Sequence, residues 1–236
     1  MKAILAIETA TDACSVALWR NQHMQQRHEV APRQHNQRLF GMLQELLPDG
    51  QLAQQGVEAI AYGCGPGSFT GLRIAASAVQ GLAFASSLPA IAVSTLACQA
   101  QTALREGLLE EGDVVLSALD ARINEIYCAC YRIEQGLPVA VQEAQAVAPG
   151  ELQLPPGSQN MVGIGSGLQF VDHYPEAVQS TLHRYYPDVL PQAQDLVPLA
   201  LAQAERGLIQ TAQQVQPVYV RDEINWKKVS EQGKRK

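Results

Sequence analysis

The sequence predicts an α/β protein made of two related lobes, each with a β-meander and packed helices. Two observations predict this fold class. Closely spaced apolar segments of strand length occur near the N-terminus and again after residue 112, and helix and strand signals follow each group. The chain has 236 residues, 47% apolar and 17% charged, which is enough for one large or two modest cores. We predict that the first lobe comprises residues 1–104 and the second comprises residues 105–236, because the strand and helix pattern restarts near residue 105.

The N-terminal lobe is predicted to begin with three strands joined by tight turns. Short apolar runs mark the first two strands, and the third extends the same meander. Two more strands follow further along the chain. The predicted strands of this lobe are residues 3–9, 13–19, 23–30, 57–63 and 90–94.

Two helices are predicted between these strands. The first is suited to start near Pro32 and to end at the Pro-Asp-Gly of residues 48–50. The second spans about residues 70–87 and follows a glycine-rich loop. The apolar residues of the first helix recur at helical spacing and are Leu39, Met42, Leu43, Leu46 and Leu47.

The C-terminal lobe is predicted to repeat this plan. A second meander comes first, and a helix rich in leucine and alanine lies within residues 189–209. The polar tail of residues 220–236 is predicted to fray at its end. The predicted strands are residues 113–120, 124–133, 139–147 and 161–165.

Charge and cysteine usage narrow the functional classes. The net charge of −6 argues against a protein that binds tRNA or DNA by itself, since such proteins usually carry a basic surface. The five cysteines include no CxxC pair, which favours free thiols in a reducing compartment. The first apolar run is short and is interrupted by Glu8, and no segment reaches the length of a membrane span. We therefore expect a cytoplasmic protein without a membrane partner.

The stretch "AYGCGPGSFTGLRIA", residues 61–75, resembles a phosphate-binding loop but matches neither common motif. A Walker A loop requires a Gly-Lys-Ser/Thr end, and the chain has no lysine between Lys2 and Lys227. The G-x-G-x-x-G pattern fails because Ser68 or Thr70 occupies its last position. We expect a structural turn onto a helix, with anion binding by the helix N-terminus as the weaker alternative.

The helix after this loop is apolar on most of its surface. One row, with Leu72 and Val79, suits the protein's own core. Glycine within a helix costs about 0.5–1 kcal/mol relative to alanine, so its presence suggests that another backbone approaches closely. The preceding helix has a similar glycine, Gly41. Two interpretations stay open: the helices pack only within this chain, or they dock onto a second protein. The second row consists of small residues, Gly71, Ala75, Ala78, Gly81 and Ala85.

Other sites of chemistry are weakly indicated. The five histidines show neither HxxxH nor HExxH spacing, so no zinc site is predicted. No G-x-S-x-G nucleophile motif occurs. "LDARINEIY" places Asp120 beside Arg122, either as a paired turn or as a partner contact. The basic residues of the tail, from Arg221 to Lys236, suit a solvated segment better than an RNA contact.

Four stretches in this order resemble the TsaB family, also called YeaZ: "ILAIETATDACSVAL", "GPGSFTGLRIA", "LDARINEIY" and "PVYVRD". The resemblance covers nearly the whole chain. It implies the two-lobed actin, Hsp70 and sugar-kinase fold. It also implies a role in making N6-threonylcarbamoyladenosine beside the anticodon of tRNA, as the non-catalytic companion of the transferase TsaD and the ATPase TsaE. By this resemblance the chain has no cofactor, and tRNA meets it only through the complex.

The residues agree with a non-catalytic role. TsaD-like chains carry H-x-x-x-H on one helix, where this sequence has Thr95 and Gln99. Kinases of this fold open the second lobe with a glycine-containing phosphate turn, and the matching turn here begins at Asp120 and contains no glycine. The rivals are an active small kinase or ATPase of the same fold and a zinc peptidase-like enzyme. The residues of a poorly equipped remnant nucleotide cleft would be Glu8, Thr9, Thr11 and Asp120.

The resemblance further implies that both predicted helices of the first lobe meet the same helices of TsaD in a four-helix bundle. The same face is expected to form a homodimer when the chain is alone. The small-residue row then has a reason, because a paired helix must come near. The expected interface residues are Arg38, Phe40, Gly41, Gly71, Arg73, Ala75, Ala78, Gln80, Gly81 and Ala85.

Overall fold

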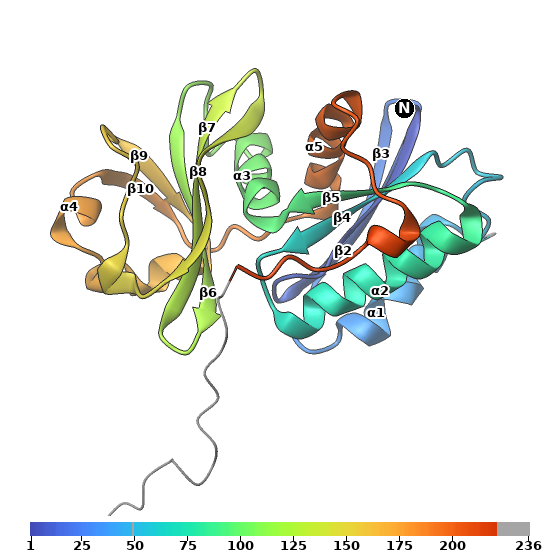
Figure 1. Cartoon of the computed structure of the whole chain (residues 1–236), viewed down its shortest axis with the longest axis horizontal. Helices are drawn as coiled ribbons and strands as arrows, with labels where there is room; N and C mark the ends of the chain where they lie inside the picture. The colour runs from blue at the N-terminus through green and yellow to red at the C-terminus, as the bar shows by residue number, and fades with distance from the viewer. Residues whose placement is uncertain (49, 221–236) are drawn as a thin grey trace, which may run out of the picture.

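The computed structural model describes residues 1–48 and 50–220, and these residues form two five-stranded sheets that stand side by side (Figure 1). The first sheet has the order β3-β2-β1-β4-β5. The meander strands are antiparallel, whereas β4 and β5 run parallel to β1. The strands are β1 (Ala3–Glu8), β2 (Ala13–Arg20), β3 (His23–Val30), β4 (Ala59–Gly65) and β5 (Ala90–Ser94).

The second sheet repeats this topology. Its order is β10-β9-β6-β7-β8, so that β6, β7 and β8 take the places of β1, β2 and β3, and β9 and β10 those of β4 and β5. The predicted pair of related lobes is confirmed by this correspondence. The strands are β6 (Val114–Arg122), β7 (Glu125–Glu134), β8 (Leu137–Val147), β9 (Met161–Ile164) and β10 (Leu182–Tyr186).

The outer faces of the two sheets are covered differently. Helices α1 (His35–Leu46) and α2 (Phe69–Ser86) pack on the first sheet. The corresponding segments of the second sheet form only η1 (Pro149–Glu151), η2 (Ser166–His173) and α4 (Glu176–Gln179). The long outer helices therefore belong to one lobe.

The remaining two helices fill the space between the sheets, and each packs on the sheet of the other half of the chain. α3 (Thr95–Arg105) ends the first half yet packs against β6, β7 and β8. α5 (Ala193–Glu205) lies in the second half yet packs against β1, β2 and β4. One apolar core consequently includes residues of both sheets and both helices. After α5, the short η3 (Ala212–Gln214) lies beside α2.

Most predicted elements are confirmed within about two residues of their predicted ends. α1 begins at His35 and not near Pro32, and His35 is buried with its Nε2 3.1 Å from the carbonyl oxygen of Ala13. The elements between residues 166 and 186 were not predicted, and α3 was expected only through the family resemblance, as the helix that carries Thr95 and Gln99. None of the helices within the described residues combines the length and the apolar character needed to cross a membrane.

Candidate docking face

The outer side of α1 and α2 exposes large apolar side chains. Phe40 on α1 is 57% exposed, and Phe69 and Phe84 on α2 are 57% and 70% exposed. They are three of the four phenylalanines in the sequence. Phenylalanine is usually buried, so three exposed rings on two adjacent helices form an unusual apolar surface and a candidate interface. We define the docking face as Arg38, Phe40, Gly41, Phe69, Arg73, Ser77, Gln80, Gly81, Phe84 and Ala85.

The opposite sides of the two helices explain why they hold this orientation. Leu39 of α1 and Leu72, Val79 and Ala83 of α2 are buried, as the apolar spacing predicts. Ser68 caps the start of α2, where its Oγ accepts a hydrogen bond from the backbone N–H of Gly71 at 3.4 Å. Each helix thus buries one row of side chains and presents the other.

The predicted row of small residues does not form one exposed surface. Gly71 is buried, and a Cβ on it would lie 2.0 Å from the carbonyl oxygen of Thr9. Ala75 is fully buried, while Gly81 and Ala85 are exposed. Gly71, Ala75 and Ala78 are buried and therefore lie beneath the docking face and not on it, contrary to the prediction. This corrects the predicted reason for Gly71, because the backbone that approaches it belongs to the same chain.

The polar members of the docking face differ in their contacts. Arg38 pairs with Glu29 of β3, with its Nε 2.8 Å from the carboxylate. The guanidinium of Arg73 lies 3.7 Å from the centre of the Phe69 ring, which is a cation–π contact. A Cβ on Gly41 would meet no atom within 4 Å.

A hollow of about 360 Å³ lies at the part of the docking face next to η3. Gln80, Gly81 and Phe84 line it from α2, and Ala212 lines it from η3. A Cβ on Gly81 would meet no atom within 4 Å. This part of α2 therefore has room for a side chain or a helix of another molecule.

The glycine-rich loop before α2 is filled by the chain itself. A Cβ on Gly63 would lie 1.9 Å from a carboxylate oxygen of Glu8, and one on Gly67 would lie 2.5 Å from the carbonyl oxygen of Ala10. Both neighbours belong to the end of β1 and the connection after it. These glycines make room for the protein's own backbone, in agreement with the predicted structural turn.

Glu8 is the most perturbed acidic group of the candidate nucleotide cleft. Burial raises the pKa of Glu8 from 4.5 to about 7, although the backbone N–H of Ala10 donates to its Oε1 at 2.7 Å and opposes the shift. Thr95 donates to its Oε2 at 3.4 Å. The structure thus brings Glu8 and Thr95 together, with both side chains buried.

The other cleft residues are engaged separately. Thr9 donates to the carbonyl oxygen of Gly71 at 2.8 Å, and Thr11 accepts from the backbone N–H of Ala13 at 3.4 Å. Asp120 accepts from the backbone N–H of Arg122 at 2.8 Å and pairs with the guanidinium of the same residue at 3.1 Å. "LDARINEIY" therefore contains the paired turn that its sequence allowed.

The two positions at which TsaD-like chains carry histidines serve internal contacts. Thr95 binds Glu8, as described above. Gln99 donates to the carbonyl oxygen of Val189 at 2.8 Å and accepts from the hydroxyl of Ser117 at 2.7 Å. Within residues 1–48 and 50–220, no group of three or more His, Cys, Asp or Glu side chains is placed to hold a metal ion.

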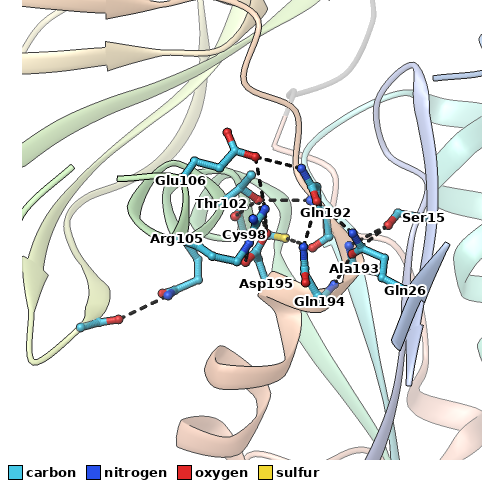
Figure 2. Close-up of polar contacts among 12 residues, drawn as sticks. Ser15, Gln26, Cys98, Thr102, Arg105, Glu106, Gln192, Ala193, Gln194 and Asp195 are labelled. Atoms are coloured by element: carbon cyan, nitrogen blue, oxygen red, sulfur yellow. Dashed lines mark hydrogen bonds and ion pairs between the residues drawn. The ribbon is translucent and has the colours of Figure 1, made fainter. Parts of the chain in front are cut away.

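A polar network fixes α5 between the two halves of the chain (Figure 2). The buried carboxylate of Asp195 accepts from Arg105 at 2.8 Å and from Thr102 at 2.7 Å. Ser15 accepts from the first backbone N–H of α5, that of Ala193, at 3.0 Å, and Gln26 accepts from the next at 2.9 Å. Side chains of the first sheet therefore satisfy the free N–H groups at the start of α5.

Comparison with known proteins places the chain in a family. The family model described as TsaD, tRNA N6-adenosine threonylcarbamoyltransferase, matches residues 22–224. The tRNA threonylcarbamoyladenosine biosynthesis protein TsaB of Escherichia coli (strain K12) is 37% identical over 96% of this chain and 97% of that protein. This chain belongs to the TsaB family.

Two further TsaB relatives agree with this assignment. The protein of the same name from Haemophilus influenzae (strain ATCC 51907 / DSM 11121 / KW20 / Rd) is 33% identical over 96% of both chains. The solved structure of YeaZ from Pseudomonas aeruginosa has a TM-score of 0.85 and 40% identity, and covers 93% of this chain and 100% of that one. The predicted TsaB family and the predicted α/β fold with two related lobes are confirmed.

Proposed function

We propose that this TsaB chain is a non-catalytic subunit of the bacterial machinery that makes N6-threonylcarbamoyladenosine in tRNA. It binds the TsaD transferase through the docking face and works together with the TsaE ATPase. Without them it forms a homodimer through the same face. It acts in the cytoplasm and has no cofactor of its own.

The observation that carries this proposal is the exposure of Phe40, Phe69 and Phe84 on adjacent helices. Aromatic residues, phenylalanine among them, are enriched in the buried centres of protein interfaces. The open ridge at Gly81 allows a partner helix to approach at the separation of about 8 Å that small residues permit. A four-helix arrangement with the partner covers all three rings.

The state of the cleft supports an accessory role. Thr95 and Gln99 hold internal hydrogen bonds in place of a metal. The glycine loop is occupied by the end of β1, so its amides do not form an open cradle for phosphate. With a net charge of −6, we expect the isolated chain to bind tRNA weakly, so that tRNA meets it within the complex.

Co-purification with TsaD and TsaE from the same organism tests the proposal. We expect Phe84→Asp and Gly81→Leu to reduce the affinity for TsaD at least thirtyfold, about 2 kcal/mol, and to give monomers by light scattering. Val139→Asp is the matched control, because Val139 is an exposed apolar residue of the second lobe. A threonylcarbamoyl-transfer assay with each variant completes the comparison.

Two results would contradict this function. Unchanged TsaD binding by both docking-face variants, with normal thermal melts, would remove the proposed interface. Threonylcarbamoyl transfer or ATP hydrolysis by the chain alone would instead favour the active-enzyme rival. Ala78 is a predicted interface residue but belongs to the core beneath α2, so a charged substitution there would disturb folding and would not test the interface.

A further inference from the structure

The segment after η3 crosses the end of β4 and reaches the docking face. The backbone N–H of Val218 donates to the carbonyl oxygen of Cys64 at 2.8 Å. The Tyr62 hydroxyl donates to Gln210 Oε1 at 2.9 Å and accepts from the backbone N–H of Gln216 at 3.3 Å. Residues 216–218 thus lie on the end of β4, to which they are joined by hydrogen bonds although the two segments are far apart in the sequence.

Gly65 is shaped for this crossing. Its φ of +122° lies in the region that favours glycine, and a Cβ there would be 2.6 Å from the carbonyl oxygen of Val218. No other residue type would allow the segment to approach so closely. The loop and the segment therefore fit each other sterically as well as through hydrogen bonds.

The segment ends in a contact with the first turn of α2. The Tyr219 ring centre lies 5.8 Å from that of Phe69 at an interplanar angle of 34°. The Tyr219 hydroxyl accepts from Arg73 Nε at 3.1 Å, and Arg73 in turn lies over Phe69. Tyr219 is 51% exposed, so the contact orders a surface and adds little to the core.

We propose that the segment 215–219 is a clasp that holds the first turn of α2, and with it Phe69 and Arg73, in the arrangement that the partner binds. Tyr219 is the positioning residue of this clasp. The inference rests on the proposed docking function. Its physical basis is that a surface fixed before binding loses less side-chain freedom when the partner arrives.

The experiment compares full-length Tyr219→Ala and Tyr219→Phe with Tyr185→Ala, the control for an exposed tyrosine of the second lobe. Amide hydrogen exchange of residues 68–76 is measured on the isolated chain, and the affinity for TsaD is measured alongside. We expect Tyr219→Ala to speed amide exchange in residues 68–76 about tenfold and to weaken TsaD binding about tenfold. The melting temperature, and amide exchange in the rest of the chain, should stay unchanged. Tyr219→Phe keeps the ring contact with Phe69, so its exchange rate and its affinity for TsaD should both lie close to those of the unaltered protein.

The outcomes separate the clasp from the docking function. In one outcome, Phe84→Asp abolishes TsaD binding while Tyr219→Ala changes neither the amide exchange of residues 68–76 nor the affinity. That result would contradict the proposed clasp and would still support the docking face. Faster exchange at unchanged affinity also overturns the clasp, because ordering would then not matter for binding. If Phe84→Asp itself has no effect, the docking function fails. Recovery by Tyr219→Phe together with loss by Tyr219→Ala supports the clasp.

Discussion

The two lobes share a strand order but differ in what covers their outer faces. The first sheet carries α1 and α2, of 12 and 18 residues, and these helices expose three phenylalanines. The second sheet carries two 3₁₀ segments and a helix of four residues. Duplication of the sheet therefore supplies the framework, whereas the docking face depends on helices that only one copy has.

The glycines at the C-terminal ends of β4 and β9 show a second difference. Gly63 of the first lobe makes room for the carboxylate of Glu8. Gly165 occupies the matching place after β9, where a Cβ would lie 2.4 Å from the Gln99 amide nitrogen and 2.3 Å from the carbonyl oxygen of Ala118. One lobe thus surrounds a titratable acid and the other a neutral amide. The surroundings of these two glycines therefore differ chemically between the two lobes.

Glycine substitutions give the largest expected effect. We expect Gly71→Ala to lower the free energy of unfolding by more than about 3 kcal/mol, because its Cβ would meet backbone 2.0 Å away. Gly81→Ala on the same helix should raise it by up to about 1 kcal/mol. Gly167→Ala in the second lobe, with its Cβ 2.7 Å from that of Ala118, should cost about 1–3 kcal/mol. Urea unfolding measures all three changes. Equal effects at Gly71 and Gly81 would contradict the conclusion that Gly71 is packed against backbone while Gly81 is open to solvent.

Glu8→Gln makes the first lobe resemble the second. Between pH 4.5 and about 7 the folded protein holds a proton on Glu8 that the unfolded chain has lost, given its folded-state pKa. The free energy of unfolding should therefore fall as pH rises through this window, by on the order of 3 kcal/mol in all. Glu8→Gln should lack this component. Urea unfolding of both proteins at pH 5 and pH 8 measures the difference, and parallel profiles would show that Glu8 does not titrate there.

The hairpin turns give the smallest effect. Ile123 and Asn124 join β6 to β7 with φ of +54° and +59°, and Ile123 is 73% exposed. A β-branched residue is unfavourable there. Ile123→Gly should raise the free energy of unfolding by about 1 kcal/mol, after allowing for the added freedom of glycine in the unfolded chain. Asn21→Gly in the β2–β3 turn is the comparison, since asparagine tolerates this conformation, and a larger gain there would contradict the argument.

The strands are predictable from sequence because their apolar runs are bounded by turn residues. β10 is the exception, since its "LHRYY" lies at a sheet edge and has no apolar run or alternation to mark it. The packing of α3 and α5 on the sheet of the other half leaves no local signal, because the apolar residues of each helix would suit either sheet. The sequence therefore does not predict which sheet each of these helices packs against, and only the structure shows it.

The candidate site is predictable only in part. Phe40, Arg73 and Gly81 are predicted members of the docking face, whereas Phe69 and Phe84 are not. Their signal is that both phenylalanines lie off the row that contains Leu72, so that one helix carries large apolar residues on two sides. The contact of Phe69 with Tyr219 joins residues far apart in sequence, and periodicity gives no information about such pairs.

The exchange of α3 and α5 has a consequence for synthesis on the ribosome. The first sheet is complete once β5 has emerged, and α3 then packs against its strands β4 and β5. The inner face of β1, β2 and β3 stays uncovered until α5, which begins at Ala193, follows. At 5–20 residues per second, the chain between α3 and α5 takes on the order of ten seconds to make. A nascent chain of this protein therefore exposes an apolar β-surface for that time, and we expect this surface to be prone to aggregation until α5 covers it.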